Sequence, residues 1–430
     1  MAKIQQINPR TILDSRGNPT IEVDIVLNDG ESGTASAPSG ASTGKSEAHE
    51  LRDLDKNHFH GKGVNKAIAN IQNEIAPALI GMNADDQQAI DECLISLDGT
   101  QNKSRLGANS ILAISLANAI ANAKSKKTSL FKLISHNENY SLPVPMLNII
   151  NGGKHAENST DIQEFMIIPA GFDTFFDALK SGSEIFHHLS KLLSEKKLNT
   201  SVGDEGGFAP SLSSNEQALE LILQAIELAS YQPGQQVFIG IDSAASEIYD
   251  NQSFKYNFNN ENKILSSENL IQLYKKWVQN YPLISIEDGI EEDSWDDWNK
   301  LNSQIGKNCQ LVGDDLFTTN PNRIERGIKE KSANSVLIKP NQIGTLTETL
   351  NAIKIAKSVN WGTVISHRSG ETESSFISDL AVATNAGQIK SGAPSRGERT
   401  AKYNQLIRIE QQLGQKAIFS GTTIFEKFIK

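Results

Sequence analysis

VFIGID (237–242) opens a series of six short apolar runs that end in charged or polar residues, and this series decides the fold. The other five are LISIED (283–288), QLVGDD (310–315), VLIKPN (336–341), VISHRSG (364–370) and QIKSGAP (388–394). From Glu287 onward these ends recur about every 25 residues, the length of one strand plus one helix. Continuous apolar runs are typical of strands covered on both faces. The series predicts an α/β protein with a parallel β/α barrel.

In such a barrel, the residues that leave the carboxyl ends of the strands point into one common mouth. These residues are Asp242, Glu287, Asp314, Lys339, His367, Arg368, Ser369 and Lys390. So much like charge beside an apolar core is tolerable only if divalent cations neutralise the acids and an anionic substrate neutralises the bases. The pattern therefore predicts magnesium and a phosphorylated or carboxylated ligand.

Length and composition limit the alternatives. A chain of 430 residues predicts two domains, and a formal charge of -10 argues against a nucleic-acid or anionic-membrane partner. The N-terminus MAKIQQINPR lacks the apolar core of a signal peptide, and the run ILAISLANAIANA (111–123) is too short to span a bilayer. Cys93 and Cys309 form no metal-binding or disulfide pattern. A soluble cytoplasmic protein without a membrane span is expected.

The first third of the chain predicts a separate α+β unit. Residues 4–27 predict two strands around a turn, and residues 63–133 show helical spacing of apolar residues. Between them, SAPSGASTGKSEAHELRD (36–53) is a loop of small residues that either closes over a ligand or simply faces solvent. Prolines interrupt all periodicity at 135–146, so we place the domains at 1–138 and 139–430.

The second domain begins with an irregular portion. Residues 145–170 predict two strands joined by a loop that carries His155, Gln163 and Glu164. A helix over about 172–197, a glycine-rich loop with Asp204 and Glu205, and a helix over 215–230 follow. Strand and helix then alternate to the C-terminus.

The three acids Asp242, Glu287 and Asp314 are hard oxygen ligands of the kind that magnesium selects. Each alone is more typical of a helix N-cap, but three in succession at strand ends favour a metal site. Lys339 lies among apolar residues, where burial and nearby cations would lower its pKa and make it a candidate base. The alternative for Lys339 is a structural ion pair with one of the acids.

An anion clamp is predicted from the remaining strand ends. Arg368 offers a planar fork and Ser369 a hydroxyl for phosphate, while Lys390 suits a carboxylate. Glu205 would act as a proton donor if poor solvation among other acids kept it protonated, although the residues alone leave that role open.

Long stretches of the chain resemble the enolase family over essentially its whole length. They include LDSRGNPTIEVDI, PSGASTGKSEAHELRD, NKSRLGANSILAISLANAIA, GGKHAENSTDIQEFMIIP, VGDEGGFAP, IGIDSAASE, SIEDG, LVGDDLFTTN, LIKPNQIGTLTET, ISHRSGETE and GQIKSGAPSRGERTAKYNQLIRIE. Motifs this long, in one order, are far more specific than a lone short pattern. Gly289 and Ser374 depart from the usual family residues, and neither is a predicted ligand.

The resemblance implies an N-terminal α+β capping domain and an eight-stranded barrel that begins ββαα. It implies reversible, glycolytic dehydration of 2-phosphoglycerate to phosphoenolpyruvate with two magnesium ions. By resemblance, Lys339 is the base and Glu205 the acid, Asp242, Glu287 and Asp314 hold one metal ion, and Ser42 holds the second. Gln163, Arg368, Ser369 and Lys390 are implied substrate contacts, and His155, Glu164 and His367 supporting groups. The family forms homodimers, often assembled into octamers.

Two alternatives remain. A racemase or ammonia lyase of the same superfamily would keep the metal acids but would not need Arg368, Ser369 or the GASTG loop. A binding role at the cell surface or in a multiprotein assembly, through the C-terminal Lys430, would be additional to catalysis. An ordinary exposed terminus explains Lys430 equally well.

Overall fold

The centre of the molecule is a closed barrel of eight strands in the order β11-β12-β13-β14-β15-β5-β6-β7. The computed structural model describes residues 2–41, 43–135, 139–156 and 159–429. The barrel strands are β5 (Val144–Asn151), β6 (Glu164–Ile168), β7 (Phe238–Asp242), β11 (Leu283–Glu287), β12 (Gln310–Gly313), β13 (Ser335–Ile338), β14 (Gly362–Ser366) and β15 (Gly387–Lys390). Each of the six apolar runs supplies one strand, so the predicted barrel is confirmed.

The barrel is parallel except at β6, which runs antiparallel to both β5 and β7. Two helices, α6 (Phe175–Glu195) and α7 (Asn215–Leu228), separate β6 from β7 and give the ββαα start that the resemblance implied. Inside the barrel, Met146, Met166 and Leu337 form a buried cluster with Phe425 and Phe428 from the C-terminal segment. Besides this apolar cluster, the interior also holds a polar contact, because Gln310 of β12 bonds Gln388 of β15 across the barrel. The polar strand ends form the mouth.

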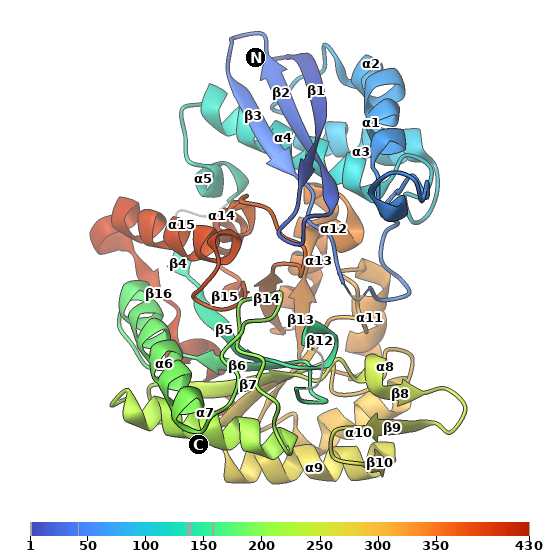
Figure 1. The fold of residues 1–430 in the computed structure, drawn as a ribbon. Coiled ribbons are helices and arrows are strands. Elements are labelled where there is room, and N and C mark those ends of the chain that lie inside the picture. The colour runs from blue at the N-terminus through green and yellow to red at the C-terminus, as the bar shows by residue number, and fades with distance from the viewer. Residues whose placement is uncertain (1, 42, 136–138, 157–158, 430) are drawn as a thin grey trace.

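Helices cover the outside of the barrel (Figure 1). They are α9 (Ser267–Asn280), α10 (Trp295–Ile305), α11 (Pro321–Glu330), α13 (Leu346–Ser358), α14 (Phe376–Ala383) and α15 (Gly397–Leu413). N-cap side chains mark the start of several helices of this domain: Thr174 before α6, Ser214 before α7 and Thr345 before α13 each accept a bond from a backbone N–H in the first turn.

One element departs from the predicted alternation of strand and helix. Between β7 and α9 the chain forms an antiparallel sheet of β8 (Tyr249–Asp250), β9 (Lys255–Phe258) and β10 (Lys263–Leu265). The strands are short and rich in polar residues, and Tyr256 and Phe258 are their buried side chains. Such a segment carries too weak an apolar alternation to be predicted as a sheet.

The N-terminal part is a second α+β unit. Its sheet contains β1 (Ile4–Leu13), β2 (Pro19–Leu27) and a third strand, β3 (Ser32–Ser36), that we had not predicted. Its helices are α1 (Asn65–Asn70), α2 (Ala76–Leu79), α3 (Gln87–Asp98), α4 (Ala108–Ser125) and α5 (Leu130–Ile134), with a π-helical turn at Ile71–Ile75. Gly33 explains the close packing of β3 on α4, because a Cβ there would lie 2.3 Å from the Ala117 carbonyl oxygen. The domain boundary predicted after residue 138 falls at 136–138, outside the described residues.

The N-terminal unit and the barrel are joined at the barrel mouth (Figure 1). Ser39 and Gly370 exchange two backbone hydrogen bonds of 2.8 and 2.9 Å, and the Ala48 N–H donates to the Gln342 carbonyl at 2.8 Å. These bonds hold parts of the loop 36–53 against the carboxyl ends of β13 and β14. None of the described helices has the length and apolar character needed to cross a membrane.

Candidate active site

The predicted site residues meet at the carboxyl ends of the barrel strands. A small cavity there is lined by His155, Gln163, Glu164, Glu205, Asp242, Asp314, Lys339, Ser366, His367, Arg368, Ser369 and Lys390. Glu287 lies beside this cavity and contacts Lys390. Ser42, predicted as a ligand of the second metal ion, lies outside the described residues.

Lys390 is surrounded by three buried carboxylates. Its Nζ lies 3.1 Å from Glu164 Oε2, 3.1 Å from Asp242 Oδ2 and 2.9 Å from Glu287 Oε1. Burial alone would lower the pKa of Lys390, but the attraction of the acids outweighs it and the pKa lies well above its usual value. Lys390 is therefore a firmly charged cation at the floor of the site.

Lys339 is paired with Asp314 in a short contact between Nζ and Oδ2. The other oxygen of Asp314 accepts a 2.8 Å hydrogen bond from the Gln342 side chain. Burial has the largest single effect and lowers the pKa of Lys339, as predicted, but the charges of Asp314 and Glu287 oppose it and the net shift is upward. The expected lowering is wrong for this geometry because the ion pair, which we had weighed as the alternative, is present.

These groups form what we call the lysine end of the mouth: Lys339, Lys390, Glu164, Asp242, Glu287 and Asp314. Four carboxylates face two ammonium groups, so negative charge is in excess. Burial together with the charge of Asp242 raises the pKa of Glu287 well above its usual value. Asp288 adds a further acid, whose two oxygens accept 2.8 Å bonds from the backbone N–H groups of Asp314 and Asp315.

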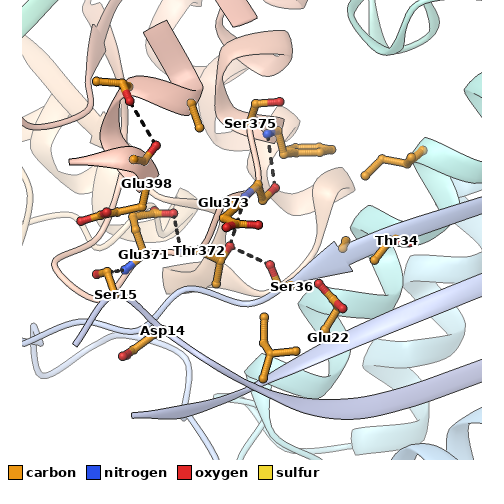
Figure 2. Close-up of a pocket in the computed structure, with 18 of the residues that line it drawn as sticks. Asp14, Ser15, Glu22, Thr34, Ser36, Glu371, Thr372, Glu373, Ser375 and Glu398 are labelled. Carbon is orange, nitrogen blue, oxygen red and sulfur yellow. Dashed lines mark hydrogen bonds between the residues drawn. The ribbon is translucent and has the colours of Figure 1, made fainter. Parts of the chain in front are cut away.

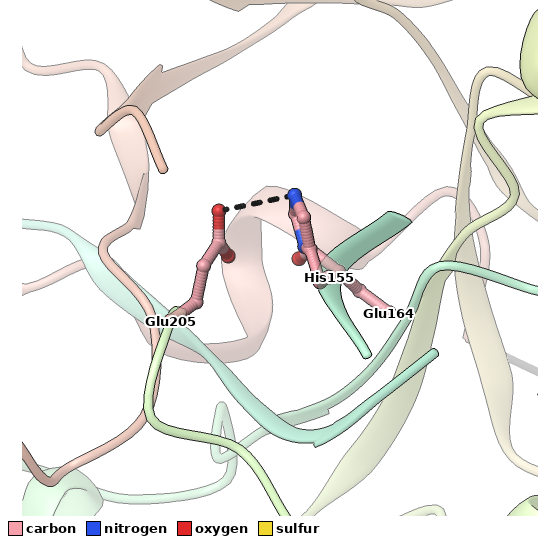
Figure 3. Close-up of side chains that lie close together, drawn as sticks. All are labelled: His155, Glu164 and Glu205. Atoms are coloured by element: carbon pink, nitrogen blue, oxygen red, sulfur yellow. Dashed lines mark ion pairs between the residues drawn. The ribbon is translucent and has the colours of Figure 1, made fainter. Parts of the chain in front are cut away.

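The opposite side, which we call the histidine end, consists of His155, His367, Glu205, Ser369 and Arg399. Figure 3 shows His155 next to Glu164 and Glu205, with its Nδ1 3.6 Å from Glu164 Oε1 and its Nε2 3.8 Å from Glu205 Oε1. The second oxygen of Glu205 lies 3.2 Å from His367 Nε2 and accepts a 3.2 Å bond from Asn148 Nδ2. Ser369 Oγ lies 3.2 Å from His155 Nε2.

Glu164 of the lysine end and Glu205 of the histidine end, the two acids that flank His155, differ in their affinity for protons. Burial, and then the charge of Glu205, raises the pKa of Glu164 well above its usual value. Burial also pushes the pKa of Glu205 upward, but His367, His155 and Arg399 outweigh it and hold the pKa well below its usual range. Of the pair, Glu164 therefore has the higher affinity for a proton, whereas the expectation placed the proton on Glu205. Burial lowers the pKa of His367 to about 4, so this ring is neutral near pH 7.

Arg368 ties the mouth to the loop 36–53. Its Nη1 and Nη2 lie 2.9 and 3.2 Å from the two oxygens of Glu47, and Nη1 also donates to Asn341 Oδ1 at 3.0 Å. Lys45, two residues before Glu47, lies 2.8 Å from Asp293 in the segment that follows β11. The loop is thus anchored by charge to two neighbouring positions of the rim.

Our sequence analysis missed Glu47, Asp288, Gln342 and Arg399. Asp288 and Gln342 lie inside motifs that we quoted, next to predicted residues, but their partners are set by the turn geometry. Arg399 did carry a signal, because residues 399, 402, 403, 406 and 409 are the buried face of α15 and a charged residue on such a face needs partners. Glu47 had no signal beyond its place in the loop 36–53.

The potential ligand atoms of the mouth suit a hard divalent cation. Carboxylate oxygens dominate the mouth, and two groups of described residues place ligand atoms within 4.8 Å of one another: His155–Glu164–Glu205 and Asp288–Asp314–Asp315. The predicted set of Asp242, Glu287 and Asp314 is not one of these groups, since its oxygens are drawn toward Lys390 and Lys339. The excess of buried carboxylates is the charge that a divalent cation balances.

A cavity much larger than the active-site cavity lies elsewhere among the described residues. A groove of about 1130 Å³ runs between the N-terminal sheet and the segment 371–376, and Figure 2 shows its acidic lining, including Glu22, Glu371, Glu373 and Glu398. None of the predicted site residues lines it. Volume alone therefore does not identify the site, and we assign the site by its converging charged groups.

Comparison with known families agrees with this arrangement. The profile described as "Enolase, N-terminal domain" matches residues 4–134, and that described as "Enolase, C-terminal TIM barrel domain" matches residues 139–428. Together they span nearly the whole chain and support a lyase of the enolase superfamily. With a closed ββαα-type barrel and an acidic mouth that holds two buried lysines, this chain belongs to the enolase family.

Proposed function

We propose that the protein reversibly dehydrates 2-phosphoglycerate to phosphoenolpyruvate, as a phosphopyruvate hydratase that requires magnesium. The observation that carries this proposal is the meeting of Lys339, Lys390 and Arg368 with an excess of buried carboxylates in one mouth. Such a site suits an anionic substrate whose reaction builds further negative charge.

Lys339 is the proposed base for the proton next to the substrate carboxylate. An ordinary lysine has a pKa near 10.4, so deprotonating it at pH 7 costs about 4–5 kcal/mol. The Asp314 contact increases that cost, whereas Arg368 and Lys390 act in the opposite direction. Lys339 therefore becomes a competent base when the charge of Asp314 is balanced by another cation.

Asp242, Glu287 and Asp314 are the proposed ligands of one magnesium ion, and Ser42 is the proposed ligand of a second. Bound magnesium would stabilise the negative charge that develops on the substrate carboxylate. Lys390 lies among the same carboxylates and contributes a fixed positive charge to that end of the substrate. A lysine base beside a metal-stabilised ene-diolate is the known chemistry of the enolase superfamily, so these roles follow from family membership as well as from the geometry.

The histidine end is the proposed place where the substrate hydroxyl is protonated and leaves. Glu205 is the proposed acid, and Glu164, with its raised pKa, is the store of the proton in the resting site. His155 lies between the two carboxylates and positions them. Arg368 and Ser369 are the proposed phosphate contacts, Gln163 is a further substrate contact, and His367 supports Glu205.

Separate assays of the two half-reactions test these roles. We expect Glu205→Gln to exchange the substrate α-proton with solvent but to form no phosphoenolpyruvate, and Lys339→Ala to do neither. Lys276→Ala, whose exposed side chain pairs with Glu216, is the control and should behave as wild type. Exchange at the wild-type rate in Lys339→Ala would refute the base assignment, and a chain that forms no phosphoenolpyruvate with magnesium would refute the reaction.

Other properties of the family are part of the same proposal. These are a place in glycolysis, a cytoplasmic location and assembly into homodimers or octamers. A surface or assembly role through Lys430 lies outside the described residues and is tested by deleting that residue. Loss of a binding partner with unchanged turnover would support that role.

A further inference from the structure

Arg399 lies behind the active site and is completely buried. It belongs to α15, which no predicted site residue occupies, and it does not line the active-site cavity. Burial of a guanidinium is costly unless its donors are used. Arg399 directs its Nη1 and Nη2 groups to two loops of the site, the one that carries His367 and Ser369 and the one that carries Glu205. Its contacts therefore constrain both of those loops.

The contact of Arg399 with His367 fixes which ring nitrogen carries the proton. Arg399 Nη1 lies 2.6 Å from His367 Nδ1. A guanidinium has five N–H donors and no acceptor, so Nδ1 must be the bare, accepting nitrogen. The proton of the neutral ring then lies on Nε2, which faces Glu205 Oε2 at 3.2 Å.

The same guanidinium also holds the backbone on both sides of the site. Its Nη1 donates to the Arg368 carbonyl at 2.6 Å, and its Nη2 donates to the carbonyls of Ser369 and Asp204 at 2.6 and 3.1 Å. Arg368 and Ser369 are the proposed phosphate contacts, and Asp204 precedes Glu205. One side chain thus links the phosphate segment to the proposed acid.

Gly392 packs closely against both Arg399 and Glu205. Gly392 has a φ of +78°, and a Cβ there would lie 2.6 Å from the Glu205 carbonyl oxygen and 2.9 Å from Arg399 Cδ. The Glu205 carbonyl in turn accepts a 2.9 Å bond from the Ala393 N–H. Arg399, the segment 392–393 and Glu205 are therefore packed as one unit.

We propose that Arg399 is a positioning residue that fixes His367 as the Nε2-protonated tautomer, so that this ring presents a hydrogen-bond donor, and never an acceptor, to Glu205. The Glu205 carboxylate then has an N–H, and not a lone pair, 3.2 Å from its Oε2. With the opposite tautomer, two acceptors would face each other. The role of the donor in catalysis rests on the proposed function, whereas the tautomer itself does not.

The first test uses the wild-type full chain. In protein labelled with ¹⁵N-histidine, long-range ¹H–¹⁵N spectra distinguish a protonated ring nitrogen from a bare one, and loss of signals in His367→Gln assigns His367. We expect a proton on Nε2 and a bare Nδ1 at pH 7.5, without substrate. A proton on Nδ1 would overturn the proposal, whatever reaction the enzyme catalyses.

The second test separates positioning from structural support. Arg399→Met removes all donors, and Arg399→Lys restores a single charged donor nitrogen with three N–H bonds. Lys402→Met is the matched control, because Lys402 is a second buried cation on α15 that bonds Glu371 and the Thr372 carbonyl instead of His367. We expect the Nε2-protonated form to be retained in Lys402→Met and partly retained in Arg399→Lys, but mixed with the other tautomer in Arg399→Met.

Kinetics should follow the tautomer. When a histidine that itself transfers the proton is held in the wrong tautomer, kcat falls about 10⁴-fold. His367 only supports the proposed acid, so we expect a smaller loss in Arg399→Met, about 10²-fold in kcat, with a smaller change in KM. Arg399→Lys should recover at least part of this loss. An unchanged tautomer in Arg399→Met, or equal kcat losses in Arg399→Met and Lys402→Met, would refute the positioning role. If Arg399→Met fails to fold, the wild-type spectrum alone decides.

Discussion

The two ends of the barrel mouth contain similar kinds of polar side chain but differ in the interactions that hold them. At the lysine end, Lys390 contacts three carboxylates within 3.1 Å, and the interactions are ion pairs. At the histidine end, a neutral His367 lies between Arg399 and Glu205, and the contacts depend on which atom donates. The lysine end should therefore respond most to removal of a charge, and the histidine end to misdirection of a donor.

Removing the cation at the lysine end should have the largest effect. In Lys390→Met, three buried carboxylates lose their partner, so we expect the free energy of unfolding to fall by about 3–5 kcal/mol near pH 8. Lys276→Met, an exposed cation paired with Glu216, should cost less than about 1 kcal/mol. Urea denaturation at pH 8 measures both.

The pH dependence of this loss has a definite sign. The pKa values of Glu164 and Glu287 already lie above their unfolded values because of burial and like charge, and loss of Lys390 raises them further. Folded protein then binds more protons than unfolded protein, so the stability of the variant rises as the pH falls. The deficit should shrink between pH 8 and pH 5.5, and an equal deficit at both would mean that these acids are already neutral.

Metal binding should have the second largest effect, and it shows which of the two ends holds the ion. Magnesium at 100 times its Kd should raise the free energy of unfolding by about 2.7 kcal/mol. We expect this gain to be lost in Asp242→Asn and kept in Asp91→Asn, a buried acid that bonds Thr347 away from the mouth. A gain that survives Asp242→Asn but disappears in Glu205→Gln would place the ion at the histidine end, where His155, Glu164 and Glu205 also converge. Thermal or urea unfolding with and without EDTA gives the measurement.

The same contrast explains which residues the sequence revealed. Asp242, Glu287, Asp314 and Lys339 each end or follow an apolar strand, so barrel periodicity alone places them in the mouth. Arg399 and Glu47 act through residues that lie far away in the chain, and no local pattern pairs them. The short β8–β10 sheet was missed because few of its residues are buried.

Charge states were harder to predict than positions. Burial of Lys339 and Glu205 followed from their surroundings, but the direction of each pKa depends on one or two contacts shorter than about 4 Å. The charges of Asp314 and Glu287 reverse the expected lowering at Lys339, and the histidines with Arg399 reverse the expected raising at Glu205. Sequence spacing determines which strand ends meet, whereas such contacts depend on side-chain rotamers and turns.

A buried acid outside both ends supplies the reference for burial alone. Asp379 in α14 accepts a 3.1 Å bond from the amide of Gln405, and burial raises its pKa to about 6. An acid whose folded pKa is raised destabilises the protein above that pKa, and the penalty disappears as the pH falls toward its unfolded value near 3.9. Asp379→Asn should therefore stabilise the protein by about 2–3 kcal/mol at pH 8 and by much less at pH 4.5. An equal gain at both values in denaturation curves would contradict the ionised state of Asp379 at pH 8.

The smallest effect is expected where the loop 36–53 meets the mouth. Both oxygens of Glu47 bind Arg368, the proposed phosphate contact, so Glu47 competes with an incoming phosphate for the same guanidinium. Glu47→Gln keeps an oxygen that can accept from the Gly44 N–H but removes the charge. We expect the KM for 2-phosphoglycerate and the inhibition constant of inorganic phosphate to fall about fivefold, roughly 1 kcal/mol.

Glu50→Gln is the matched control for this variant, since Glu50 lies on the same segment but pairs with Arg52. It should leave both constants unchanged. A rise in both constants for Glu47→Gln would instead show that Glu47 holds Arg368 in its binding position, because losing a competitor strengthens phosphate binding whereas losing a support weakens it. Steady-state kinetics at two ionic strengths separates the cases further, since competition between charges weakens with added salt while the support of a buried contact changes little.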